Sequence, residues 1–162
     1  MRNTLSLITY SILTLLLLST SACTRKSSDT IAPNNETNPI PFDAIHNCHK
    51  ASNPYPSQIT NNILGNWQWE KTFNPWTQKT TFASKHVLIH FNDASTYHIT
   101  ESGVTVATGV WSLKQLSSTE WQLQLTQDYE HTQGTIALCN NELILSSTYV
   151  DGPANYFVRK SQ

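Results

Sequence analysis

The stretch from Lys85 to Glu101 reads KHVLIHFNDASTYHITE, and it decides the fold. Within it, Val87, Ile89 and Phe91 are apolar at every second position, which is the period of a strand with one buried face. The turn-forming residues NDA, 92–94, follow, and then a second run rich in Thr, Tyr and Ile begins. Because so short a connection joins antiparallel neighbours, the stretch predicts two adjacent antiparallel strands.

The same pattern recurs over the C-terminal 98 or so residues, where short runs rich in Trp, Val, Ile, Thr and Tyr are separated by Gly, Asn, Asp and Ser. Eight runs are predicted to be strands: Leu64–Thr72, Lys85–Asn92, Ser95–Glu101, Val104–Lys114, Thr119–Tyr129, Gly134–Asn140, Glu142–Val150 and Asn155–Lys160. Their short connections leave no room for crossover helices. Strands with one apolar face bury that face and leave no exposed sheet edge when the sheet closes into a barrel. The predicted fold class is therefore all-β, an antiparallel up-and-down eight-stranded barrel.

Composition limits the possible functions. The chain has 162 residues, with ten Lys plus Arg against eleven Asp plus Glu and a formal net charge of -1. This balance offers no basic surface for nucleic acid. The sequence has no nucleophile elbow, zinc-protease helix, phosphate loop or dinucleotide fingerprint. We therefore expect no nucleic-acid partner, no enzyme activity and no cofactor.

The N-terminus is typical of a secretion signal. Arg2 supplies a positive charge, and the apolar run from Leu5 to Leu18 follows it. The run is too short for a helix that crosses a bilayer of roughly 30 Å, but it has the length of a signal-peptide core. Residues 1–22 are therefore predicted to be a signal peptide.

The end of this segment, STSAC at residues 19–23, resembles the lipobox of bacterial lipoproteins. The resemblance implies cleavage before Cys23 and acylation of its side chain and new amino group, which would anchor the chain stably in a membrane. Thr24 stands where an inner-membrane retention signal has Asp, so the resemblance favours the outer membrane, with the domain facing the periplasm or the cell surface. Thr20 replaces the usual aliphatic residue, so cleavage by an ordinary signal peptidase after Ala22 stays open.

Residues 24 to about 44 combine Ser, Thr, Asn and Pro with almost no aliphatic periodicity. Such a segment cannot bury enough apolar surface to offset the entropy of ordering, and it is predicted to be a flexible spacer. The expected organisation is a signal peptide at 1–22, a lipidated cysteine with its tether at 23–44, and a barrel domain with a lead-in segment at 45–162.

A family resemblance supports the predicted barrel. Gly65-Asn66-Trp67 opens the first strand and Arg159 lies in the last, which resembles the Gly-x-Trp start of the lipocalin barrel and the Arg that packs on its Trp. Together with LIHF at 88–91, ELIL at 142–145 and DGP at 151–153, the order of motifs is similar to lipocalin-like domains in lipoproteins of Bacteroidetes-type bacteria. The resemblance covers about 98 residues and implies a barrel floor built from the Gly, the Trp and the Arg. It implies much less about function.

Two interpretations of the inward aromatic residues stay open. Six side chains are candidates to line a cavity for an apolar or amphipathic small molecule: Trp69, Phe91, Tyr97, Trp111, Trp121 and Tyr156. They could equally fill the interior, because packed and ligand-holding barrels of eight strands share the same alternation. It also stays open which residues of the last strand face inward, since Arg159 shares a face with Phe157 and not with Tyr156.

The connection from Thr72 to Ser84 is long and aromatic for a hairpin loop, and we expect Phe73, Pro75 and Trp76 to be exposed there. This loop motivates the alternative function. In that reading the barrel is a packed structural or interaction module, and Phe73 and Trp76 contact another protein of the cell envelope.

The cysteines and histidines suggest a crosslink more than a metal centre. His46-Asn47-Cys48-His49 contains ligand types that suit zinc or copper, but no spacing motif supplies a fourth ligand. Once Cys23 is lipidated, Cys48 and Cys139 are the remaining thiols, and in an exported protein they favour a disulfide. We predict that disulfide and no metal site. The other histidines are expected to be solvent-facing strand residues: His86, His90, His98 and His131.

Overall fold

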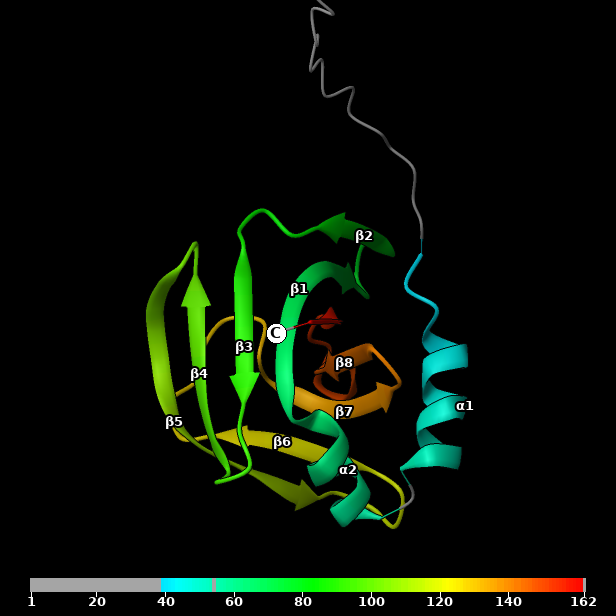
Figure 1. Cartoon of the computed structure of the whole chain (residues 1–162). Helices are drawn as coiled ribbons and strands as arrows, with labels where there is room; N and C mark the ends of the chain where they lie inside the picture. The colour runs from blue at the N-terminus through cyan, green and yellow to red at the C-terminus, as the bar shows by residue number, and fades with distance from the viewer. Residues whose placement is uncertain (1–38, 54, 162) are drawn as a thin grey trace, which may run out of the picture. The chain divides into compact units, whose positions relative to one another are not determined.

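The computed structural model describes residues 39–53 and 55–161, which form a sheet of nine antiparallel strands with two short helices (Figure 1). The predicted signal peptide, Cys23 and most of the predicted tether lie outside the described residues. The elements in chain order are α1 (Phe42–Ser52), α2 (Pro56–Ile63), β1 (Gly65–Asn74), β2 (Lys79–Phe82), β3 (Val87–Phe91), β4 (Thr96–Glu101), β5 (Val104–Gln115), β6 (Trp121–Leu125), β7 (Gly134–Cys139), β8 (Glu142–Ser146), the 3-10 turn η1 (Thr148–Val150) and β9 (Ala154–Lys160). In the described part of the chain, neither helix is long and apolar enough to cross a membrane.

The sheet closes on itself. Consecutive strands pair from β3 through β9, and β1 pairs with both β3 and β9. This closure makes an eight-stranded antiparallel up-and-down barrel of β1 and β3–β9, so the predicted fold class is confirmed. We call the end where β1 begins the lower end and the opposite end the mouth.

The strand β2 was not predicted from the sequence. The first part of β1 pairs with β3 from Gly65 to Gln68, whereas its last four residues pair with β2. The predicted loop from Thr72 to Ser84 is therefore largely a β1–β2 hairpin, in which β1 stays paired with β9 as far as Phe73. The four residues of β2 are mostly exposed, so they carry no apolar alternation by which the strand could be predicted.

Two predicted strands end earlier than expected. Strand β6 ends at Leu125 instead of Tyr129, and β8 ends at Ser146 before η1. The chain leaves the sheet after β6 and returns at Gly134, which has a φ of +124°. A Cβ atom at Gly134 would lie 2.2 Å from the carbonyl oxygen of Ser146, so β7 can approach β8 here only with glycine.

The two helices cover different parts of the barrel. Helix α2 lies at the lower end, where Ile59 and Ile63 are fully buried in the same cluster as Trp67 (Figure 1). Helix α1 lies beside β7, outside the barrel, and begins at Phe42, within the range predicted to be the spacer. Both helices are short, of 11 and 8 residues, and neither was predicted from the sequence.

The packing of α1 on the outside of the barrel explains why β7 and β8 have apolar residues at consecutive positions. Ile45 of α1 packs with Ala137, Ile144 and Ala154 in a second hydrophobic cluster on the outer face of the barrel. The neighbouring residues of β7 and β8 face the interior and belong to the main core. These strands are therefore buried on both faces, and polar residues do not alternate along them.

Candidate functional site

The floor of the barrel is built as the lipocalin-like resemblance implies. Arg159 and Trp67 are direct partners in the β1–β9 register, and the guanidinium carbon lies 4.2 Å from the centroid of the indole. The guanidinium also donates hydrogen bonds to the carbonyl oxygens of Leu64 and Asn62. A Cβ atom at Gly65 would lie 3.0 Å from the same guanidinium, so glycine leaves the room that it needs.

The phase of β9 is settled by burial. Phe157 is fully buried in the interior cluster, and Arg159 shares its face. Tyr156 consequently faces outward and packs against the cluster under α1. Its hydroxyl donates to Glu142 Oε1 at 2.8 Å, and burial together with this hydrogen bond raises the pKa of Tyr156. The expectation that Tyr156 lines the interior was therefore wrong, because the strand presents its odd-numbered residues inward.

The other aromatic candidates fill the interior. Trp69, Phe91, Tyr97 and Trp111 are at most 5% exposed, and all belong to the main core. The rings of Phe91 and Trp111 meet edge to face with centroids 5.7 Å apart. Trp121 is half-buried and packs against the same core. These side chains share one core with aliphatic residues of the other strands, such as Ile99 and Leu143, as they would in a packed barrel.

The hollows found in the structure lie elsewhere. Five open hollows of about 300–380 Å³ have different borders: the loop at 128–133 with the β8–β9 connection, α1 with β7, β6 with the loop at 128–133, β5 with β6, and β1 with the chain after β2. Among the six aromatic candidates, Trp69 alone borders one of these five.

Two buried indole groups lack a hydrogen-bond partner among the described residues. These are the Nε1 atoms of Trp111 and Trp121. The other two interior tryptophans are satisfied: Trp67 donates to the carbonyl oxygen of Ile63 at 2.6 Å, and Trp69 donates to Thr72 Oγ1 at 3.1 Å. A buried donor without a partner costs about 1–3 kcal/mol, so the Trp111 site is the polar feature of the interior that calls for explanation.

The loop from residue 126 to 133 covers the mouth. Thr132 is fully buried, and the His131 ring stacks on Trp69 with centroids 3.8 Å apart. His131 was predicted to be a solvent-facing strand residue and is instead part of this cover. The hydroxyl of Tyr97 donates to the carbonyl oxygen of Gln127 at 2.6 Å and accepts from its N–H at 3.0 Å, which ties the loop to β4.

A second polar contact holds the same loop. The Tyr129 hydroxyl donates to Glu101, whose other carboxylate oxygen lies 3.1 Å from Lys85 Nζ. Burial and the hydrogen bond to Glu101 raise the pKa of Tyr129 to about 12. The Tyr129 and Lys85 hydrogen bonds lower the pKa of Glu101. Each group is thereby held in its ordinary charge state, which suits an anchor for the loop.

The rim of the mouth carries an exposed apolar surface, which we call the rim patch and define as Trp76, Tyr149 and Val150. Their exposed fractions are 73%, 54% and 64%. Trp76 Nε1 donates to the carbonyl oxygen of Asp151 at 2.8 Å, which fixes the β1–β2 turn against η1. Phe73 was expected to be exposed beside Trp76, but it is half-buried. Its ring packs edge to face on that of Phe42 in α1, with the ring centroids 5.4 Å apart.

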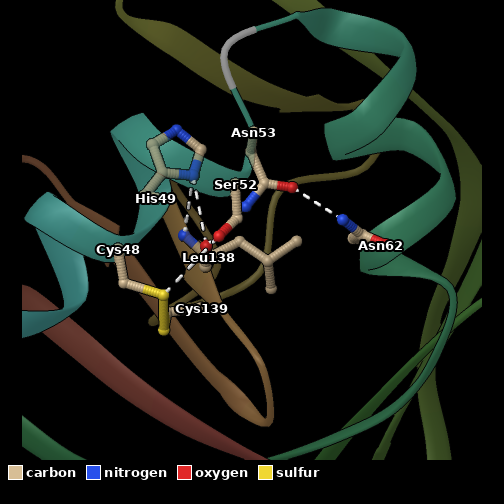
Figure 2. The surroundings of a disulfide bond; sticks show 7 residues. All are labelled: Cys48, His49, Ser52, Asn53, Asn62, Leu138 and Cys139. Atoms are coloured by element: carbon tan, nitrogen blue, oxygen red, sulfur yellow. Dashed lines mark hydrogen bonds between the residues drawn. A yellow bond between two sulfur atoms is a disulfide. The ribbon is translucent and has the colours of Figure 1, made fainter.

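The predicted disulfide is present and joins α1 to β7 (Figure 2). The Cα atoms of Cys48 and Cys139 are 5.6 Å apart. The sulfur considered as a metal ligand is thus used in the crosslink. Around it, the backbone N–H of Leu138 donates to His49 Nδ1 at 3.1 Å, while Asn53 Nδ2 donates to the carbonyl oxygen of Leu138 at 2.7 Å. His49 Nδ1 also lies 3.3 Å from that carbonyl, but it must be unprotonated to accept from Leu138 N, so the neutral ring acts as an acceptor here.

The structure also brings together two histidines that lie far apart in the sequence. His90 and His98 are direct partners in the β3–β4 register, and their rings stack with centroids 4.8 Å apart. No group of three or more potential metal ligands forms within residues 39–53 and 55–161.

Comparisons with protein-family models, with curated proteins and with solved structures find no match for this chain. The inference of function therefore rests on the packing and the surface of the described residues.

Proposed function

We propose that this protein is an interaction module of the bacterial cell envelope, anchored to the outer membrane by a lipid on Cys23, which binds a protein partner through the rim patch. The observation that carries the proposal is the contrast between the interior and the rim. The interior aromatics belong to one buried core, whereas Trp76 at the rim is 73% exposed. Large aromatic residues at protein surfaces are characteristic of binding hot spots.

The local structure suits Trp76 for such a contact. Its indole N–H is held by the carbonyl of Asp151, so little side-chain freedom remains to be lost on binding. Beside Val150 lies an open hollow of about 380 Å³, bordered also by Tyr129, His131 and Pro153. A partner with an apolar side chain that fills this hollow would bury the rim patch around it.

The test is a photoactivated crosslinker placed at position 76 in living cells. We expect a crosslinked species of one discrete added mass that disappears when Val150 is changed to Asp. The matched control places the crosslinker at Val104, which is 67% exposed at the start of β5, a strand that contributes no residue to the rim patch. Equal crosslinking at positions 76 and 104, or an adduct that persists in the Val150→Asp variant, would contradict the proposal.

A carrier of a small apolar molecule is the second candidate, and one observation favours it. The unpartnered Nε1 of Trp111 in the interior could donate to a polar atom of a bound molecule. Native mass spectrometry of the protein purified from the envelope distinguishes the candidates. An excess mass that is lost on denaturation would favour the carrier, and the bare mass of the protein would favour the packed module.

The proposed anchor has its own test. Changing Cys23 to Ser removes the acylated side chain, so the variant should leave the membrane fraction for the soluble fraction. Retention of the variant in the membrane would contradict lipid anchoring at Cys23.

A further inference from the structure

The outer face of the barrel carries a row of polar side chains that crosses four strands. Asn66, His90, His98 and Thr108 stand opposite one another in the registers of β1, β3, β4 and β5. Their neighbours along the strands, such as Ile89 and Ile99, are fully buried and face the interior. The row therefore faces outward, with the two imidazoles at its centre.

We propose that His90 and His98 form a binding site for a divalent transition-metal ion that prefers imidazole ligands, with Cu²⁺ bound more tightly than Zn²⁺. The two rings stack with centroids 4.8 Å apart and come from paired positions of adjacent strands. A cross-strand pair is held by the sheet, so a metal ion would not have to order two separate segments. Imidazole nitrogen suits both ions, and the general order of affinities places Cu²⁺ above Zn²⁺.

The hydrogen bond of His90 prepares it to be a ligand. Its Nδ1 lies 2.7 Å from Asn66 Oδ1, and an amide oxygen can only accept. The proton of the neutral ring is therefore on Nδ1, and the lone pair is on Nε2. In metal sites, a ligating histidine commonly donates its other N–H to a carbonyl or carboxylate oxygen in this way. Asn66 thus sets both the tautomer and the orientation of His90.

The charge around the pair also suits a cation. The cross-strand pairs on either side of it along the sheet are Leu88 with Thr100 and Asn92 with Thr96, none of which carries a charge. The nearest cation in the same register is Lys160, which stands opposite Asn66 on β9, and its ammonium is paired with Glu70 at 3.0 Å. His98 is exposed, so its ring is free to turn toward a metal ion.

The experiment is a titration of the full-length protein with Cu²⁺, followed by calorimetry and by electron paramagnetic resonance. We expect one binding event whose spectrum shows nitrogen hyperfine structure from imidazole. The event should be lost in His98→Ala and in His90→Ala. Asn66→Ala should weaken it by about tenfold, because the second-shell hydrogen bond is removed. Zn²⁺ should compete for the same event with lower affinity.

The matched control is His86→Ala, which removes an exposed histidine that does not belong to the row. Its Cu²⁺ binding should equal that of the unchanged protein. Since His98 is exposed, its replacement should leave the fold intact, which circular dichroism checks. Undiminished binding in a folded His98→Ala variant would overturn the proposal. So would an equal loss in His86→Ala, because the ion would then bind histidines without selection.

Discussion

Arg159 combines three contacts at the lower end of the barrel. Its guanidinium stacks on Trp67 and donates to the carbonyl oxygens of Leu64 and Asn62, where α2 passes into β1. One side chain therefore holds the covering helix to the last strand. The adjacent Lys160 instead forms an ion pair with Glu70 at 3.0 Å, with side chains that are 41% and 32% exposed.

We expect Arg159→Met to lower the free energy of unfolding by about 2–4 kcal/mol, because a cation-π contact and charge-assisted hydrogen bonds are lost together. The neighbouring Lys160→Met variant should cost less than about 1 kcal/mol, as is usual for exposed ion pairs. Urea unfolding of both variants measures the difference. Equal effects would show that the floor contact adds nothing beyond surface charge.

The indole N–H groups of Trp67 and Trp111 provide a second comparison at the scale of single residues. Replacing either residue by Phe removes a similar volume. In Trp67→Phe a hydrogen bond to Ile63 is lost, whereas in Trp111→Phe an unpartnered donor is removed. Trp67→Phe should therefore be less stable than Trp111→Phe by about 1–3 kcal/mol in urea unfolding. A larger cost for Trp111→Phe would reveal a partner for its N–H in solution.

At the scale of elements, α1 is joined to the barrel by a covalent bond as well as by packing. The disulfide spans 91 residues of chain, and Ile45 is buried against the barrel beside it. Asn53, at the end of α1, also accepts from Asn62 of α2 at 2.8 Å, so the two helices and β7 meet at one point (Figure 2). The strand pairings that close the barrel do not involve α1.

Reduction of the disulfide should lower the free energy of unfolding by roughly 4 kcal/mol, because the unfolded chain regains the freedom of a long loop. Far-ultraviolet circular dichroism should still show a folded barrel, while α1 should become more accessible to proteolysis. The Cys48→Ala/Cys139→Ala double variant is the control, since its stability should not respond to reductant. Stability that is equal with and without reductant in the native sequence would contradict this role.

At the scale of the whole molecule, burial lowers the pKa of three histidines besides His90, which favours their neutral form in the folded protein. His49 lies between α1 and β7, His131 covers the mouth, and His46 lies on α1. Burial is the main cause that lowers the pKa of each below its ordinary value of 6.5. Below about pH 6.5 the unfolded chain consequently binds more protons than the folded protein.

The sign of the pH dependence follows from this difference. The free energy of unfolding should be highest above pH 6.5 and should fall as the pH is lowered from 6.5 toward 5. Urea unfolding at pH 7.5, 6 and 5 measures the fall, and His131→Gln should make it shallower. Stability that increases on acidification over this range would contradict the buried neutral histidines.

The sequence by itself determined the barrel. Residues that alternate at period two, such as Val87, Ile89 and Phe91, have one face to bury, and short turns between such runs leave antiparallel pairing as the available solution. The Cys48–Cys139 pair could also be predicted, because these are the two thiols that remain once Cys23 is assigned to the lipid anchor. The contact of Trp67 with Arg159 was implied by the resemblance to lipocalin-like barrels.

Only the tertiary structure decided the interior packing, the strand register and the position of α1, because the sequence pattern of one segment does not specify which residues of other segments it contacts. The alternation of inward residues is the same in a filled barrel and a hollow one, so the packing of Trp111 against Phe91 depends on the volumes that meet across the interior. The pairing of His90 with His98 depends on strand register. Helix α1 is stabilised mainly by contacts with the barrel, which a short, weakly amphipathic segment does not reveal by itself.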